Sequence, residues 1–159
     1  MIEPVAQELF VDFEQEEELE NWHGNVSRST QYVFTSDYSL QATHTITEAS
    51  SGLRFATWEE EFSGDVLLIH YYLPSTPNVE IDYLEFCIPG WWDDCRGMDD
   101  TRDQWHMAIF DFRYGFDNAA EFPGLAVLGN VAAPGATQPI SYSVYLDAIQ
   151  SLKFEDRKP

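Results

Sequence analysis

The sequence predicts an all-β protein, a β-sandwich jelly roll of two antiparallel sheets, and three observations support this fold class. Short runs rich in β-branched and aromatic residues recur along the chain, separated by Gly, Pro, Ser and Asp. Helical periodicity is nearly absent, except that Glu14 to Trp22 is expected to form a turn or two of helix. The spacing gives about nine strands with regular turns, which is typical of two packed sheets.

Each predicted strand is one such run between two turn segments. The predicted strands cover residues 9–13, 24–34, 38–46, 52–60, 65–73, 79–88, 104–112, 124–131 and 142–153. Neither a repeat nor a linker interrupts the series. Residues 1–159 are therefore predicted to form a single domain, with a frayed tail at 155–159.

The run DVLLIHYYL shows how a strand divides between core and surface. The row that begins at Leu67 is the better core row, and the other row carries His70 and Tyr72. The next run, VEIDYLEF, places Glu80 and Asp82 in a polar row. If the two strands pair through the turn PSTPN, these four side chains share one face. A face that combines aromatic rings with hydrogen-bonding groups suits a sugar.

The charge of the chain restricts its partners. Eight basic residues stand against 28 acidic residues, which gives a formal net charge of −20. Nucleic acid, anionic membranes and acidic polysaccharides are repelled by such a surface. The sequence also lacks a run of the ~18 apolar residues that a membrane helix needs. We therefore expect a neutral partner, no nucleic acid and no membrane.

The stretch IPGWWDDCRGM has a turn-like composition and carries two adjacent tryptophans. Trp91 and Trp92 cannot both point inward in an extended segment, so one is expected to pack and one to be exposed. The exposed ring would be a stacking platform, and the alternative is a loop lid in which both rings cover the end of the sandwich. Cys87 and Cys95 flank this segment and form either a disulfide or two buried thiols. Their spacing does not favour a zinc or redox site.

Three segments resemble the jelly-roll carbohydrate-binding modules of polysaccharide-degrading enzymes. LFVDFEQEEELENWHG is similar to their opening F-x-F-E…W, and STQYVFTSDYSLQATH to their second motif, which contains Y-S-L. YSVYLDAIQSLKF resembles their closing strand, V-Y-I-D-D-V-S-L. The resemblance spans nearly the whole chain. It implies a secreted or extracellular protein that binds polysaccharide without catalysis and is linked to a catalytic module.

The resemblance also implies a structural calcium ion. Many such modules bind calcium through an acidic residue of the opening strand, loop carbonyls near Y-S-L and the Asp of the closing strand. The matching positions are Glu14 or Asp12, the loop at 37–39, and Asp147. Oxygen ligands from three segments suit calcium. The alternative is that Asp147 accepts hydrogen bonds from loop amides.

The remaining tryptophans divide between core and surface by alternation. Trp22, in the opening motif, and Trp105, in a row with Met107 and Ile109, are predicted to be buried. Trp58 shares a row with Arg54, so a ligand contact is expected there. The predicted ligand contacts are Trp58, Tyr72, Trp91, Trp92, Arg54, His70, Glu80, Asp82 and Arg113.

The favoured ligand is a neutral plant or microbial polysaccharide such as a β-glucan, xyloglucan or mannan. The main alternative is catalytic, because Glu80, Asp82 and Glu85 match the E-x-D-x-x-E signature of laminarinase-like retaining glycoside hydrolases. In that resemblance Glu80 is the nucleophile and Glu85 the acid/base, and a β-bulge must bring both to one side. A protein-docking domain is a third possibility.

Overall fold

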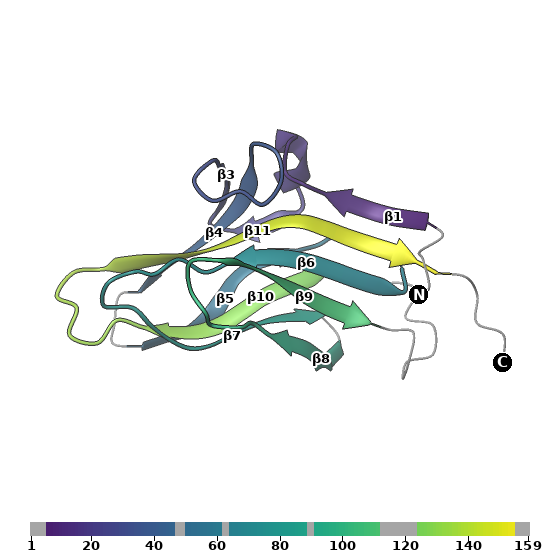
Figure 1. Ribbon diagram of the computed structural model, residues 1–159. Helices are drawn as coiled ribbons and strands as arrows, with labels where there is room; N and C mark the ends of the chain where they lie inside the picture. Colours follow the sequence, from purple (N-terminus) through teal and green to yellow (C-terminus); the bar gives the residue numbers. More distant parts are fainter. Residues whose placement is uncertain (1–5, 47–49, 62–63, 89–90, 112–123, 155–159) are drawn as a thin grey trace.

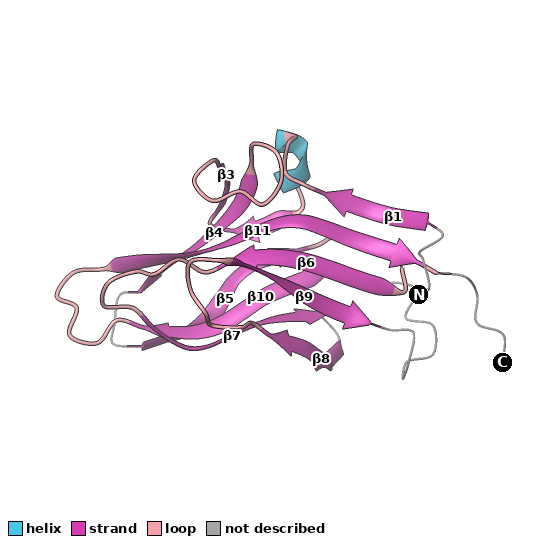
Figure 2. Ribbon diagram, viewed as in Figure 1, coloured by secondary structure: helices cyan, strands magenta, loops and turns pink. Residues whose placement is uncertain are grey.

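The computed structural model describes residues 6–46, 50–61, 64–88, 91–111 and 124–154. Figures 1 and 2 show two antiparallel sheets packed against each other, which confirms the predicted fold class. Helix in the described ranges is limited to one 3-10 turn, η1 (Glu16–Leu19), inside the segment predicted to be helical. The described part contains no helix that is long and apolar enough to cross a membrane.

The larger sheet has six strands in the order β3-β4-β11-β6-β9, with β1 also paired to β11. Its strands are β1 (Ala6–Val11), β3 (Val26–Ser29), β4 (Ser39–Ile46), β6 (Val66–Tyr72), β9 (Trp105–Asp111) and β11 (Ile140–Lys153). The five-stranded sheet has the order β2-β5-β10-β7-β8. Its strands are β2 (Trp22–Gly24), β5 (Ser50–Trp58), β7 (Glu80–Ile88), β8 (Trp91–Gly97) and β10 (Leu125–Ala132).

The core lies between the sheets. The predicted core row of β6 is confirmed, because Leu67, Ile69 and Tyr71 are all at most 3% exposed. Trp22 is also buried as predicted, and its ring stacks on that of Trp58 at a centroid distance of 5.6 Å. The burial of apolar side chains such as these is the main source of stability in a β-sandwich.

The predicted pairing of the strands at 65–73 and 79–88 is wrong. Strand β6 pairs with β9 and β11, whereas β7 belongs to the other sheet and pairs with β8 and β10. The segment between them begins at Leu73 and ends at Val79, and both side chains are buried in the core. A connection with both ends in the core crosses from one layer to the other and makes no hairpin.

The tryptophan pair lies on a strand that the sequence did not predict. Residues 91–97 form β8, the edge strand next to β7, in place of the expected turn. Cys87 lies opposite Cys95 in this strand pair, and the two form a disulfide, as one of the two alternatives predicted. The disulfide therefore ties the edge strand to its neighbour.

Candidate functional site

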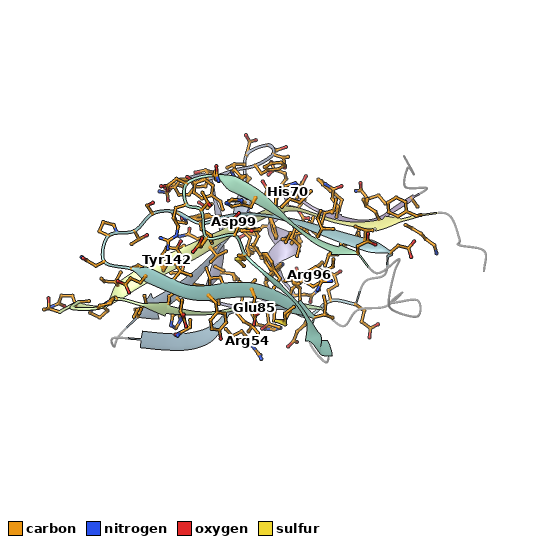
Figure 3. The ribbon with its side chains drawn as sticks, turned by 60° about the horizontal axis from the view of Figure 1, so that its bottom comes forward. Arg54, His70, Glu85, Arg96, Asp99 and Tyr142 are labelled. Atoms are coloured by element: carbon orange, nitrogen blue, oxygen red, sulfur yellow. A yellow bond between two sulfur atoms is a disulfide. The ribbon has the colours of Figure 1, made fainter. Side chains whose placement is uncertain are left out.

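Each sheet has an outer face, and the two faces differ in chemistry. Figure 3 shows His70 on one sheet and Arg54 and Glu85 on the opposite sheet. The polar face is the outer face of the five-stranded sheet, with Arg54, Glu80, Asp82, Tyr83, Glu85, Leu128 and Asn130. The aromatic face is the outer face of the six-stranded sheet, with Phe10, Gln41, Leu68, His70, Tyr72, Trp105, Met107, Ile109, Tyr145 and Gln150.

The centre of the polar face is Tyr83, whose side chain is 50% exposed. It lies opposite Asn130 of β10, and the Asn130 Nδ2 donates to Asp82 Oδ2 at 3.2 Å. The next row crosses the sheet through Arg54, Leu128 and Glu85. The exposed ring therefore shares its outer face with carboxylates on its own strand β7, an amide on β10 and a guanidinium on β5.

A β-bulge produces this arrangement. Asn130 is opposite Tyr83 and Val131 is opposite Ile81, so Asp82 is the extra residue in β7. Ile81 packs against the core, whereas Asp82 and Tyr83 are both exposed. The bulge thus places two consecutive side chains outward, together with Glu80 on one side and Glu85 on the other.

The disulfide borders the polar face. A carboxylate oxygen of Glu85 and the two sulfurs of Cys87 and Cys95 all lie within 4.8 Å of one another. Carboxylate and thiolate are metal ligands, but both sulfurs are bonded to each other here. This cluster is therefore a structural cross-link with an adjacent carboxylate.

The aromatic face carries rings that pack on one another. Tyr32 and Phe34, from the loop after β3, stack on Tyr72 and His70 at centroid distances of 4.3 and 4.0 Å. Trp105 lies 5.6 Å from the rings of both Phe34 and Tyr72. Much of the ring area of Tyr72 is thus covered by the protein's own loop.

The prediction that Trp105 is a core residue with Met107 and Ile109 is wrong. Trp105 is only half-buried, and Met107 and Ile109 are 47% and 46% exposed. The core side chains of β9 are Ala108 and Phe110, which belong to the opposite row. The alternation of inward and outward side chains along β9 was predicted correctly, but the row that contains Trp105, Met107 and Ile109 faces outward.

The loop between β3 and β4 is held by two carboxylates. Asp147 Oδ2 accepts from the backbone N–H groups of Phe34 and Thr35, each at 3.0 Å. Glu14 accepts from the N–H groups of Asp37 at 3.0 Å and Tyr38 at 2.8 Å. The two carboxylates bind both halves of one loop, and that loop carries the rings that cover the aromatic face.

Asp147 is fully buried at a bulge in β11. Its Oδ1 accepts from the N–H of Ala148, which has a positive φ of 46°. Burial, with a smaller contribution from Glu14, raises the Asp147 pKa to about 6. The hydroxyl of Thr35 is buried without a hydrogen-bond partner. Two carboxylates and an unpartnered oxygen are the kind of donor set that calcium uses.

Asp12, the other acidic residue of the opening strand, has a different partner. Its Oδ1 accepts from the N–H of Glu14 at 3.2 Å. Its negative charge also contributes to the raised pKa of Glu18, which is caused mainly by burial. Asp12 therefore orients the start of η1, whereas Glu14 reaches the loop.

The predicted contact residues are divided between the two faces. Arg54, Glu80 and Asp82 lie on the polar face, and His70 and Tyr72 lie on the aromatic face. The expectation that these acids share a face with His70 and Tyr72 is therefore wrong. The side chains of Trp91 and Trp92, and all of Arg113, fall outside the described part of the structure.

The predicted exposure of Trp58 is also wrong, because its side chain is 1% exposed. A bulge in β5 explains the error. Val127 lies opposite Ala56 and Leu128 lies opposite Arg54, so one extra residue shifts the alternation between positions 54 and 56. Arg54 points outward, whereas Trp58 points into the core and donates its indole N–H to Glu60 at 3.1 Å.

Sequence reasoning did not propose Tyr83 or Asn130, or Glu85 as a ligand contact. The run VEIDYLEF placed Tyr83 in the apolar row with Ile81, and the bulge at Asp82 moves it to the opposite side. The only hint in the sequence is the expected need for a bulge if Glu80 and Glu85 are to share a face.

No protein-family model matches this sequence, and neither does any curated protein. Among solved structures, the chain is similar to TmCBM27, a carbohydrate-binding module described as recognising mannan. The TM-score is 0.51 with 14% identity, over 93% of this chain and 97% of that one. Two further similar structures have TM-scores below 0.5.

The first of these two structures is the CBM22-1 xylan-binding domain of Paenibacillus barcinonensis Xyn10C. Its TM-score is 0.48 with 17% identity, over 98% of this chain and 100% of that one. The second is the Endo-D glycoside hydrolase domain of Streptococcus pneumoniae R6. Its TM-score is 0.49 with 12% identity, over 87% of this chain and 22% of that one. The chain has the β-sandwich fold of a carbohydrate-binding module.

Proposed function

We propose that this domain binds a neutral polysaccharide on its polar face without cleaving it. The main observation is the half-exposed Tyr83 ring surrounded by hydrogen-bonding side chains on three adjacent strands. A pyranose has an apolar C–H face and a polar rim, so a ring beneath it and polar groups beside it match both parts.

The roles of the polar side chains follow from their chemistry. Asp82 and Glu85 accept hydrogen bonds from sugar hydroxyls, Arg54 donates, and Asn130 does both. The carboxylates outnumber the guanidinium on this face, and the chain has a net charge of −20. A uronate-rich chain would be repelled, which favours a β-glucan, xyloglucan or mannan.

The experiment is affinity electrophoresis against a panel of soluble neutral and acidic polysaccharides. Tyr83→Ala is expected to weaken retardation by about thirtyfold, because loss of one stacking ring costs about 2 kcal/mol. Phe34→Ala is the matched control, since Phe34 is a similarly exposed ring, at 44%, next to the opposite face. Equal weakening by both variants would contradict the assignment of the polar face.

We also propose that Glu14, Thr35 and Asp147 hold a structural calcium ion. Calcium would supply positive charge between two carboxylates and a partner for the unsatisfied hydroxyl of Thr35. The expected result is a melting temperature that rises with calcium and falls with EDTA. Asp147→Asn should abolish this response, whereas Asp82→Asn, an exposed carboxylate on the other sheet, should retain it.

Glycoside hydrolysis is a second candidate, favoured by one observation. The bulge at Asp82 puts Glu80, Asp82 and Glu85 on the same outer face, as the catalytic signature requires. A reducing-sugar assay on the electrophoresis samples separates the two functions. Sugar release that disappears in Glu80→Gln would support hydrolysis, and retardation without release supports binding.

We further propose that the domain works outside the cell, linked to a catalytic module that degrades the same polysaccharide. The disulfide supports this location, because such bonds persist in oxidising compartments. A binding domain tethered to an enzyme raises the effective concentration of substrate near the active site.

A further inference from the structure

The connection between β2 and β3 carries an Asn-x-Ser motif. It consists of Asn25, Val26 and Ser27, and none of the other four asparagines in the sequence begins an Asn-x-Ser/Thr motif. This motif, with any residue except proline in the middle, is the acceptor for N-linked glycans on secreted proteins. The folded protein can carry such a glycan only at its surface, so the position of Asn25 in the fold decides whether the motif can be used.

The structure places both functional side chains of the motif at the surface. Asn25 and Ser27 are exposed, and Val26 between them is half-buried. Asn25 is the single residue between the end of β2 at Gly24 and the start of β3. Its backbone carbonyl accepts from the N–H of Thr43 at 2.9 Å. The main chain is therefore fixed at Asn25, while its side-chain amide remains exposed to solvent.

Gly24 produces the sharp turn that presents Asn25. Its φ is 117°, and a Cβ atom at this position would lie 2.8 Å from the backbone oxygen of Phe55, so only glycine fits. Strand β2 is the end strand of the five-stranded sheet, and β3 is the end strand of the six-stranded sheet. The chain crosses between the two layers here, and Asn25 lies at the edge of the sandwich.

This edge is separate from the polar face around Tyr83. The five-stranded sheet has the order β2-β5-β10-β7-β8, so β2 is three strands away from β7, which carries Tyr83. Neighbouring strands lie about 4.8 Å apart, which places the backbone of β2 about 14 Å from that of β7. The hydrogen bond with Thr43 of β4 also holds Asn25 toward the other sheet. A glycan attached at Asn25 therefore leaves Tyr83 accessible.

The disulfide indicates the compartment in which such a glycan is added. Disulfides form in oxidising compartments such as the lumen of the endoplasmic reticulum, and Cys87 and Cys95 form one here. N-linked glycans belong to secreted proteins of the same route. The motif and the disulfide are independent features of the chain, and both are consistent with export.

We propose that Asn25 is the acceptor of an N-linked glycan at the edge of the sandwich, where the glycan leaves the polar face accessible. The inference rests on the extracellular location proposed above. The co-substrate is an oligosaccharide attached to a lipid diphosphate. Nδ2 of Asn25 forms a bond to C1 of the first sugar, the bond from C1 to the diphosphate oxygen breaks, Nδ2 loses one proton, and the lipid diphosphate leaves. The bulky, hydrated glycan adds to the solubility of the protein.

The test directs the full chain into the secretory pathway of yeast and examines the total product by intact mass and peptide mapping. Most molecules are expected to carry a glycan that peptide-N-glycosidase removes, which leaves an aspartate in place of Asn25. Asn25→Gln and Ser27→Ala should each abolish the modification, whereas Ser27→Thr should retain it. Asn21→Gln is the matched control, because Asn21 is also exposed but begins no motif. The glycosylated protein and Asn25→Gln should be retarded equally by polysaccharide.

Two results would overturn the proposal. The first is a folded chain with an intact disulfide between Cys87 and Cys95 and an unmodified Asn25. The second is polysaccharide retardation that the glycan blocks and Asn25→Gln restores, because the glycan would then cover the polar face. Failure of the disulfide to form in the secretory pathway would count against the extracellular location instead. Loss of retardation in Tyr83→Ala concerns the proposed function alone.

Discussion

The two sheets present aromatic rings outward in opposite ways. On the polar face Tyr83 is half-exposed among Asp82, Glu85 and Asn130, which hydrogen-bonds Asp82. On the aromatic face Tyr72 is stacked by Tyr32, a ring from the protein's own loop. An exposed ring with polar neighbours suits an amphipathic ligand such as a sugar, whereas the rings of the aromatic face are largely covered by contact with one another.

The comparison shows that aromatic content alone does not identify a sugar site. The aromatic face has more rings than the described part of the polar face, but those rings pack largely on one another. What distinguishes the two faces is whether a ring is free on one side and flanked by donors and acceptors. The following variants test how each face contributes to stability and to polysaccharide binding.

The largest expected effect concerns the loop that covers the aromatic face. Asp147→Ala removes the acceptor for the N–H groups of Phe34, Thr35 and Ala148, so unfolding free energy should fall by about 3 kcal/mol. Urea denaturation measures this loss. Polysaccharide binding by the folded variant should persist. Loss of binding would indicate that the sugar lies on the aromatic face and would contradict the proposed site on the polar face.

Removal of the disulfide tests the border of the polar face, because the bond lies beside Glu85. Replacing Cys87 and Cys95 together by Ala should lower the free energy of unfolding by about 2–3 kcal/mol, because the closed loop is short. Polysaccharide affinity should fall as well, since the bond that ties β8 to β7 at the border of the polar face is then lost. Thermal denaturation and electrophoresis on the same samples give both values. Unchanged affinity in the destabilised variant would show that the cross-link at the border of the polar face does not support sugar binding.

A smaller effect is expected from one carboxylate. Glu85→Gln keeps the shape of the side chain but loses the charge that strengthens its hydrogen bonds to hydroxyls, and should weaken binding up to tenfold, about 1.4 kcal/mol. Isothermal titration calorimetry measures the change. Asp37→Asn, at an exposed position on the loop after β3, is the control and should bind normally.

The last expected effect is a pH dependence of stability in EDTA. The Asp147 pKa is raised to about 6 from the model-compound value of 3.8, so the folded state binds its proton more tightly than the unfolded state. Its contribution is therefore complete below pH 4 and is lost as the pH rises through about 6. Comparison of melting temperatures with Asp147→Asn isolates this group, and parallel pH profiles would refute the assignment.

Most strand positions could be predicted from the sequence, because turn residues and β-branched runs are local signals. The predicted strand at 24–34 is an exception, because it covers the end of β2, all of β3 and part of the loop that follows. The predicted strand at 38–46 corresponds to β4, and the strand at 142–153 lies within β11. Disulfide formation was one of two open alternatives. Edge strand β8 was missed because Pro, Gly and Asp residues gave its segment the composition of a turn.

The direction of individual side chains could not be predicted wherever a bulge interrupts the alternation. A bulge in β5 reverses the expected direction of Trp58, and a bulge at Asp82 reverses that of Tyr83. Bulges depend on the partner strand, which sequence periodicity does not contain. The prediction for Trp105 was wrong for another reason: its row is apolar but faces outward.

The most direct test of the account is an NMR titration of the isotopically labelled protein with a soluble oligosaccharide of the retained polysaccharide. The account predicts chemical-shift changes concentrated on β5, β7 and β10, around Arg54, Tyr83 and Asn130, with little change on β6 and β9. Changes concentrated at His70, Tyr72 and Trp105 would contradict it.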